Sequence, residues 1–271
     1  MLPIAFRPTF LGLAFAVCLA LPAAAQDSDA NDLHALLIKA GSYYAGVIVP
    51  LDYAKALDTY KQAAALGDGY AMSMVGVMYD KGQSVPEDPV EALAWFRKGA
   101  DAGDARAMYN VAVDYEVGRG TDKDQAQAAV WYRKGAEAGD GASMMRLGDF
   151  YYAGASLDKS LKQAAAWYQK AVDIRYSKAY WVLAVRYMYG EGVGRDAHKA
   201  AELTYTALLR GDDTARHTLD GAKKTDLPPH FIQYLQEMLT RDGFYTGEAD
   251  DDYGPAVSDA IALAFGSADR R

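Results

Sequence analysis

The 271-residue sequence has little cysteine, a deficit of positive charge and no long apolar run. A single cysteine, Cys18, excludes an intramolecular disulfide and a cysteine-based zinc site. The 28 Lys and Arg residues are outnumbered by 36 Asp and Glu residues, so the net charge is −8. Nucleic acid is therefore excluded as the main ligand, because a protein that neutralises phosphates needs the opposite charge. With 51% hydrophobic and 24% charged residues, the composition is that of a folded chain.

The most apolar segment, residues 10–21, is too short to span a membrane comfortably. Arg7 precedes it, and the small residues 23–25 follow it directly before Gln26. This order of charge, apolar core and small residues is typical of a secretory signal peptide. We therefore predict that residues 1–25 are a signal peptide and that the mature protein starts near Gln26.

The compartment follows from the same segment. Removing the leader also removes Cys18, and a chain without thiols suits an oxidising compartment. We expect a secreted protein, in the periplasm and in contact with the cell wall. A lipoprotein anchored at Cys18 is the alternative, but the apolar residues on both sides of that cysteine do not fit a lipobox.

The middle of the chain repeats with a period of 36 residues. Trp95, Trp131 and Trp167 are evenly spaced, and each is followed by an aromatic residue and, two residues later, by a lysine. The same period relates one series of tyrosines, one of glycines and one of alanines: Tyr43, Tyr79, Tyr115, Tyr151 and Tyr187; Gly46, Gly82, Gly118, Gly154 and Gly190; Ala56, Ala92, Ala128, Ala164 and Ala200. Five units are predicted, with a partial sixth from Gly211: residues 31–66, 67–102, 103–138, 139–174 and 175–210.

Each unit has the start and stop signals of two helices. In unit two, Asp68 is suited to cap a first helix that Gly82 ends in a left-handed conformation. Asp88 then caps a second helix with Pro89 at its first position. The second cap recurs in every unit, as Asp52, Asp88, Asp124, Ser160 and Asp196. Stacked helix pairs predict an all-α solenoid, with the tryptophan and tyrosine series as its core.

These residues resemble the Sel1-like repeat, a relative of the tetratricopeptide repeat. The similarity rests on Ala71, Val75-Gly76, Tyr79, Gly82, Val85, Asp88, Ala92, Trp95-Phe96 and Lys98 and their counterparts. We assign residues 31–219 to this solenoid. Unit five has Leu203 and unit one has Thr59 where tryptophan is expected, as is usual for the ends of an array. The resemblance implies an adaptor or regulatory role through protein binding, without chemistry of its own.

The last segment, residues 228–271, is predicted to be a small three-helix domain. It follows a boundary at Lys223-Lys224 and Pro228-Pro229. Its sequence is similar to a small peptidoglycan-binding domain through Leu235-Gln236, Leu239, Gly243-Phe244-Tyr245, Gly247, Asp250, Tyr253-Gly254-Pro255, Ala260 and Phe265. It departs from that family at Asp251, where glycine is usual, and at Val257, where threonine is usual.

The sequence contains no pattern of a catalytic site. The four histidines lack the spacing of a helical zinc site: His34, His198, His217 and His230. The Gly-x-Ser-x-Gly motif is absent, and Asp and Glu fall mainly at helix caps and exposed faces rather than in the pair that a glycosidase needs. The acidic turn 250–252 lacks the spacing of a calcium loop. We predict no enzyme, no cofactor and no metal site; a cell-wall hydrolase with an unrecognised site is the alternative.

Two sets of binding residues are predicted. The resemblance implies that partners bind the concave surface formed by the first helices, where side chains not used by the repeat core are Tyr70, Ser73, Arg106, Tyr109, Met145, Lys178 and Trp181. For Met145 and Trp181, packing under a neighbouring helix or under the tail is the alternative. The candidates for contact with peptidoglycan are Phe244, Tyr245, Asp250 and Tyr253. Their alternative role is to pack a miniature core, with the aspartates left in water.

Taken together, the sequence predicts a periplasmic, non-enzymatic adaptor. It would bind a protein or peptide partner on its solenoid and attach to peptidoglycan through its tail, with no nucleic acid partner and no membrane span. The alternative is an envelope regulator or inhibitor whose tail is only a structural cap.

Overall fold

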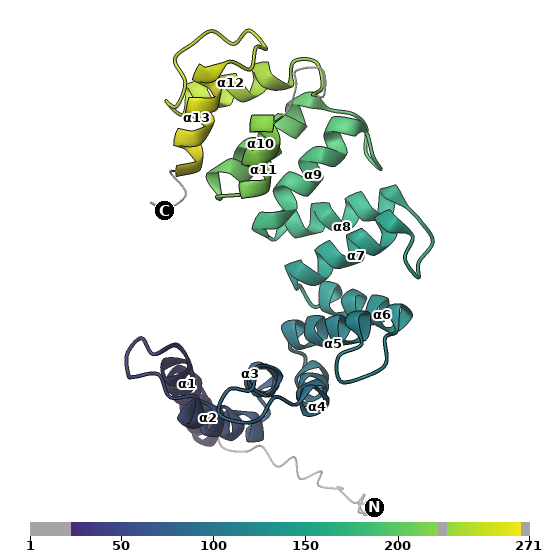
Figure 1. Cartoon of the computed structure of the whole chain (residues 1–271). Helices are drawn as coiled ribbons and strands as arrows, with labels where there is room; N and C mark the ends of the chain where they lie inside the picture. Colours follow the sequence, from purple (N-terminus) through teal and green to yellow (C-terminus); the bar gives the residue numbers. More distant parts are fainter. Residues whose placement is uncertain (1–22, 222–226, 267–271) are drawn as a thin grey trace, which may run out of the picture.

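The computed structural model describes residues 23–221 and 227–266, with side chains from Asp32 onward. In these residues the chain forms 13 helices and no strand (Figure 1). The helices are α1 (Ala23–Ala45), α2 (Tyr53–Ala65), α3 (Gly69–Asp80), α4 (Pro89–Asp101), α5 (Ala105–Val117), α6 (Gln125–Glu137), α7 (Gly141–Ala153), α8 (Leu161–Asp173), α9 (Ser177–Tyr189), α10 (Ala197–Leu209), α11 (Asp213–Gly221), α12 (Phe231–Arg241) and α13 (Pro255–Gly266). The all-α prediction is confirmed.

The predicted caps form. At the start of each second helix, the Asp or Ser side chain accepts hydrogen bonds from backbone N–H groups two or three residues later. The glycine after each first helix has a positive φ, from 62° at Gly82 to 79° at Gly118. Asp68, Asp104 and Asp140 also cap first helices, whereas Tyr176 makes no side-chain cap before α9. Local backbone chemistry therefore sets the helix boundaries.

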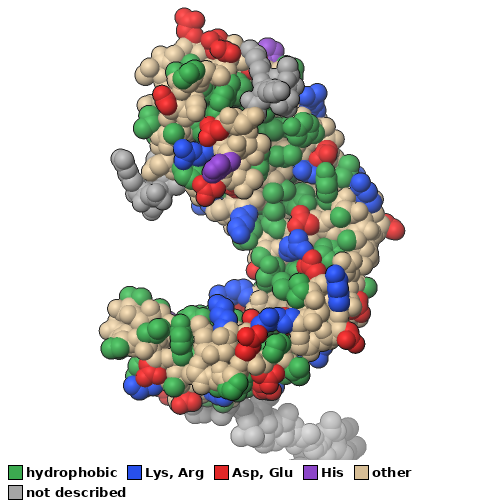
Figure 2. All heavy atoms as spheres, in the orientation of Figure 1, with side chains coloured by type: hydrophobic (Ala, Val, Ile, Leu, Met, Phe, Trp, Pro, Cys, Tyr) green, Lys and Arg blue, Asp and Glu red, His purple; other side chains and the backbone are tan. Residues whose placement is uncertain are grey.

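The helix pairs stack into a C-shaped solenoid. Each second helix packs against the first helix of its own unit and against the first helix of the next unit, from α1 and α2 to α9 and α10. Figure 1 shows α1 and α2 at one end of the C, and α12 and α13 at the other. The space-filling view shows an open hollow between the two arms, with Lys and Arg side chains along its inner edge (Figure 2).

Within each unit, the second aromatic residue is more buried than the tryptophan before it. Phe96 and Tyr132 are 4% and 0% exposed, whereas Trp95 and Trp131 are only half-buried. The lysine three residues after each tryptophan lies over its indole ring, at 3.8 Å for Lys134 over Trp131. The prediction that the tryptophan series is core is thus correct for Trp167, which is buried, and wrong for the other two. Their indole rings lie at the edge of the stack, where a cation can cover the face that water would otherwise contact.

Side chains that lie 39 residues apart join neighbouring units. Arg119 donates a 2.5 Å hydrogen bond to Asp80 and a 2.7 Å hydrogen bond to Glu87. At the corresponding place two units later, Tyr152 donates to Glu191 at 3.3 Å. The Arg119–Asp80 and Tyr152–Glu191 hydrogen bonds both join the loop after a first helix to the end of the first helix in the preceding unit. They therefore fix successive units against each other.

A glycine in the same loop permits a close backbone approach. Gly120 has a φ of +68°, and a Cβ there would lie 2.2 Å from the Pro89 carbonyl oxygen at the start of α4. Gly192 meets Leu161 in the same way, at 2.0 Å. In units two and four the position is serine, also with positive φ. The loop of each unit therefore packs on the second helix of the unit before it.

The tail is packed onto the solenoid. Helix α11 occupies the sequence position of the first helix of the expected partial sixth unit, but it is α12 that makes the main packing contact with α10. One hydrophobic cluster runs from α8 to α13 and includes Leu208, Leu219, Phe231 and Ile261. Instead of three helices, the described part of the tail contains two. Its apolar residues complete the solenoid core, so the tail caps the array.

In the part of the chain that the structure describes, no helix is both long and apolar enough to cross a bilayer.

Candidate functional site

The structure separates the predicted partner-binding residues into two groups. In the first, Tyr70 is half-buried between the Tyr60 ring, 6.2 Å away, and the guanidinium group of Arg106, 4.3 Å from its centroid. Tyr109 is half-buried against Tyr132, at 5.7 Å between ring centroids. Ser73 is only 4% exposed, so its side chain is not available on the surface of the first helices. These residues hold neighbouring units together, with Arg106 the most accessible.

The second group lines one groove. Met145 on α7 and Lys178 and Trp181 on α9 come together around a cavity of about 560 Å³. Its remaining lining comes from the start of α9, the α10–α11 turn and the start of α11: Ser177, Val182, Arg210, Gly211, Asp212, Asp213 and Thr214. We call this set the first-helix groove, because α7, α9 and α11 are the first helices of three consecutive units.

Trp181 forms the apolar floor of the groove. It is 7% exposed and belongs to the hydrophobic cluster that extends to α13, which is the packing role given above as its alternative. Met145 is half-buried and packs against the same cluster. A floor held by core packing is rigid, which favours binding because little side-chain freedom is lost.

Charges of both signs surround this floor. Lys178 is exposed on one side, and Arg210 lies 4.7 Å from the Tyr180 ring and donates to the Arg175 carbonyl. In the α10–α11 turn, Asp212 accepts from the Ala215 N–H at 2.9 Å and so caps α11. The groove can therefore pair with both a carboxylate and an ammonium or guanidinium group.

A second cavity continues from the first. It has a volume of 500 Å³ and is lined by Trp181, Val185, Met188, Tyr189, Thr218, Gly221 and Leu227. Trp181 lines both cavities and lies between them. The second cavity is mostly apolar, so the two together offer a charged compartment followed by an apolar one.

Sequence reasoning missed the contribution of α11. Thr214 lies 36 residues after Lys178, so the period that relates Lys178 to Arg106 also points to it. The tryptophan series ends at Trp167 and the glycine series at Gly190, so neither of these signals marks a sixth unit. Arg210 and Asp212 had no such signal, because they lie in a turn whose position depends on how α10 and α11 pack.

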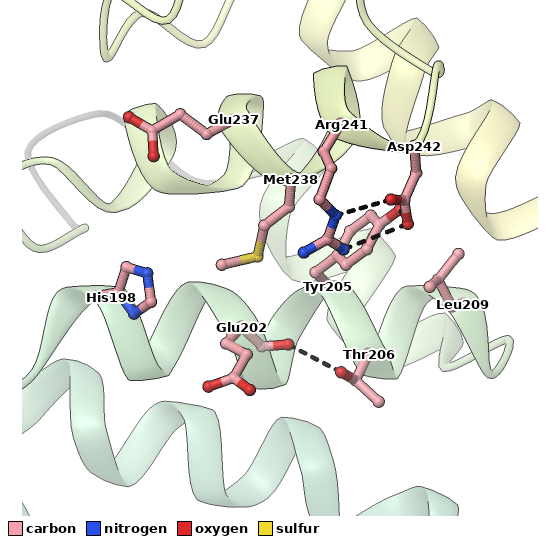
Figure 3. A pocket seen from close by; sticks show the side chains of 9 residues that line it. All are labelled: His198, Glu202, Tyr205, Thr206, Leu209, Glu237, Met238, Arg241 and Asp242. Carbon is pink, nitrogen blue, oxygen red and sulfur yellow. Dashed lines mark hydrogen bonds and ion pairs between the residues drawn. The ribbon is translucent and has the colours of Figure 1, made fainter.

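A third cleft lies between α10 and α12. It has a volume of 540 Å³, and Figure 3 shows its nine lining side chains: His198, Glu202, Tyr205, Thr206, Leu209, Glu237, Met238, Arg241 and Asp242. Tyr205 donates to Asp242 at 2.5 Å, and Arg241 donates to the same carboxylate at 2.8 Å. The cleft is closed at one end by contacts that hold the tail to α10.

The predicted peptidoglycan residues mostly serve the tail itself. Phe244 and Tyr245 are half-buried against the cluster shared with the solenoid. Asp250 accepts from Gln236 at 2.9 Å. Tyr253 donates to Asp220 of α11 at 3.1 Å, and burial together with the charge of Asp220 raises its pKa. Each of the four side chains therefore takes part in packing or hydrogen bonds of the tail or of its junction with α11.

Asp251, at the departure from the peptidoglycan-binding pattern, is a strained position. Its φ is +61°, where glycine is favoured. Its carboxylate accepts from the backbone N–H groups of His230 and Gln233 at the start of α12. This cap gives a reason for aspartate at a left-handed position.

Within residues 23–221 and 227–266, no three His, Cys, Asp or Glu side chains are grouped so that they could hold a metal ion.

Comparisons with known proteins agree with the repeat architecture. The family described as the Sel1 repeat matches residues 37–68, 69–104, 105–140, 141–173 and 177–212. Units two to five begin two residues later than the boundaries drawn from the period, at the first helical residue. Sel1 repeats are generally protein-interaction scaffolds, and no catalytic family is indicated. The tail's resemblance to a peptidoglycan-binding domain gains no support.

Solved structures show the same fold. A Sel1 repeat protein from Oxalobacter formigenes superposes with a TM-score of 0.70 at 24% identity, covering 88% of this chain and 89% of that one. A protective antigen from uropathogenic Escherichia coli gives a TM-score of 0.62 at 27% identity and covers 90% of this chain, which spans 55% of that protein. An immunity protein from Pseudomonas aeruginosa has a TM-score of 0.51 at 18% identity, covering 86% and 82%.

No curated protein sequence matches the chain. The five family matches, however, together cover more than half of the 271 residues. The chain belongs to the Sel1 repeat family.

Proposed function

We propose that this protein is an exported, non-enzymatic adaptor that binds a segment of a partner protein in the first-helix groove. The observation that carries the proposal is the pair of adjoining cavities that share Trp181. Large apolar side chains on a rigid floor with charges at the rim are the features that concentrate binding energy at protein interfaces.

The chemistry of the groove indicates the kind of segment that fits. An apolar side chain would enter the cavity beside Val185 and Met188. A neighbouring acidic residue would pair with Lys178 or Arg210, and a basic one with Asp213. We therefore expect an extended or helical segment that carries an apolar residue beside charged ones.

Site-specific crosslinking tests this proposal. A photoreactive amino acid placed at Thr214, which lines the groove, is expected to capture a defined partner in the cells that make the protein. The matched control is the same amino acid at Val130, which is exposed on α6 and remote from the groove in the chain. Addition of Lys178→Glu is expected to reduce the Thr214 crosslink several-fold, with no change in the helical spectrum. Equal capture from both positions would contradict the groove assignment.

Export to the periplasm is part of the proposal and is supported by the order of residues 1–26. N-terminal sequencing of the exported protein is expected to find Gln26 or a neighbouring residue at the start. Retention of the full chain in the cytoplasm would contradict it.

A second candidate function is that of an envelope regulator or inhibitor whose tail is only a cap. It is favoured by the hydrophobic cluster that runs without a break from α8 to α13. Attachment to peptidoglycan through residues 228–271 would distinguish the wall-bound adaptor from this regulator. Sedimentation of the purified full chain with peptidoglycan tests it: pelleting that is lost on Tyr245→Ala supports wall attachment, and absence of pelleting favours the regulator.

A further inference from the structure

The loop between α1 and α2 carries large apolar residues at two positions where the later units have charged or small residues. Val47, Ile48 and Leu51 are 81%, 77% and 54% exposed, and residues 47–51 form an unbroken apolar run. We call these five residues the apolar tip. In units two to five, the position of Leu51 is always charged, and the position of Ile48 is always glycine or serine: Glu87, Lys123, Lys159 and Arg195; Ser84, Gly120, Ser156 and Gly192.

No other part of the described chain covers the tip. The corresponding loops of later units pack on the second helix of the preceding unit, as Gly120 does at Pro89. Unit one has no preceding unit, and its loop lies at the free end of the arm formed by α1 and α2 (Figure 1). Hydrophobic side chains are visible on the surface of this arm in Figure 2. Three large aliphatic side chains exposed together at one loop indicate an interaction site.

A further repeat is not the occupant. Lys39 is exposed on α1 at the position where the later units bury Val75, Val111, Leu147 and Leu183, each 0% exposed. That helix face thus carries a charged side chain at a position that the later units fill with an apolar one, although Ile38 beside it is 53% exposed. Stacking would need an apolar residue at the position of Lys39. In the stacked units, the loop positions of Ile48 and Leu51 hold small or charged residues instead of large apolar ones.

A second copy of the chain is also a poor occupant. A stable dimer buries about 800 Å² on each partner. A tip of three large side chains falls well short of this area, and on α1 the charged Lys39 interrupts the apolar surface beside the exposed Ile38. The occupant must accept a small convex apolar tip without needing a matching surface.

A phospholipid surface meets that requirement, and the base of the loop fits it. Tyr44 and Tyr53 are half-buried with ring centroids 5.6 Å apart, and Lys55 lies 5.4 Å from the Tyr43 centroid. The Lys55 side chain is 62% exposed and forms a 3.0 Å ion pair with Asp52, which directly follows the tip. Tyrosine and lysine below an apolar tip suit the polar layer of a bilayer, because each has an apolar body and a polar end. We propose that the tip inserts into a phospholipid surface and holds the N-terminal arm on it.

Vesicle binding tests the proposal. The protein to use is the chain from Gln26, because the apolar leader would itself bind lipid; the first residue of any described hydrophobic cluster is Leu33, so the core stays complete. The probe is vesicles of phosphatidylethanolamine and phosphatidylglycerol. We expect the chain to sediment with them, also in about 0.5 M salt, where exposed charges are screened.

Two matched triple variants assign the contact. Val47→Ser, Ile48→Ser and Leu51→Ser together are expected to weaken sedimentation about tenfold or more, because the inserted apolar area is lost. The control, Val90→Ser, Val117→Ser and Val130→Ser, removes three exposed aliphatic side chains elsewhere and is expected to leave binding unchanged. Helical spectra of both variants check the fold.

Three results would overturn the proposal. One is a chain that does not sediment with vesicles. Another is equal sedimentation of the two variants, which would show that the tip is not the contact. The third is a dimer, detected by light scattering in the absence of lipid, that only the tip variant loses; the tip would then bind a second copy. Because neither variant changes the first-helix groove, these results leave partner capture at Thr214 unaffected.

Discussion

At the scale of single residues, position within the repeat does not by itself determine burial. Tyr132 is 0% exposed and donates to Glu116 at 2.6 Å, whereas its neighbour Trp131 is half-buried beneath Lys134. The period shows that two residues share an environment in all units. It does not show whether that environment is the centre or the edge of the stack, which depends on the distance between helices.

This difference leads to a paired prediction for unit three. Tyr132→Ala is expected to destabilise the protein by about 3–5 kcal/mol, because it leaves a large cavity in the core. Trp131→Ala is expected to cost about 1–3 kcal/mol, because its ring is already partly in contact with water and is covered by a mobile lysine. Urea unfolding of the two variants measures both values, and a larger loss for Trp131→Ala would contradict the burial order.

Asp114 is a carboxylate in a core position. It is 5% exposed, its Oδ2 has no hydrogen-bond partner, and the same position in the neighbouring units is Met78 or Phe150. Burial, with the charge of Asp80, raises the pKa of Asp114 to about 7, against the opposing effect of Arg119. Acidic residues are expected mainly at caps and exposed faces, and the apolar residues 36 positions away are the signal in the sequence that singles out Asp114.

A pH dependence follows from Asp114. Between its unfolded pKa of 3.8 and about 7, the folded state binds more protons than the unfolded state, so stability falls as the pH rises through this window. Asp114→Asn removes the charge, and we expect it to be more stable than the natural chain at pH 8, by at most about 4 kcal/mol, and nearly equal near pH 4. Melting temperatures of both chains across this range measure the effect. Asp158→Asn, at an exposed loop residue, is the control, and parallel curves for Asp114→Asn would contradict the assignment.

At the scale of helices and loops, most of the fold could be predicted from the sequence. Capping residues such as Asp88 and the glycine that follows each first helix are local signals, and the structure places helix ends at them. The tail was different. Its apolar faces predicted helices correctly, but no local signal shows that they pack on α10 rather than on each other. For the same reason, the half of the groove on α9 was predicted and the half at α11 was not.

The loop after a first helix is sterically restricted where its backbone meets the start of the preceding second helix. Gly120→Ala would place a Cβ 2.2 Å from the Pro89 carbonyl oxygen, at a φ of +68°. We expect a loss of about 2–4 kcal/mol from strain and displacement of α4. Gly194→Ala is the control, because nothing lies within 4 Å of its Cβ position. Thermal unfolding of the two variants gives the comparison, and equal melting temperatures would show that the loop can relax.

At the scale of the whole molecule, stability depends on contacts between neighbouring units. The tail contributes Phe231, which is 0% exposed, to the cluster that reaches α8. Phe231→Ala is therefore expected to lower hydrogen-exchange protection in α10 to α13 and to leave α3 to α6 unchanged, since solenoid contacts are local. Leu263→Ala, at a side chain 62% exposed, is the control. Loss of protection along the entire chain would show that the array unfolds as one unit.

The alternation of glycine and serine in the inter-unit loops shows that the natural building block is longer than one repeat. Glycine at 120 and 192 and the links from Arg119 and Glu191 return every 72 residues, whereas serine stands between them at 84 and 156. Deleting 36 residues would bring unlike junctions together, so that a serine would meet a helix start such as Pro89, where a Cβ has no room without a shift of the backbone. Deleting 72 residues would leave glycine and serine alternating at the junctions as before. An array of this kind can change its length by pairs of units far more readily than by single ones.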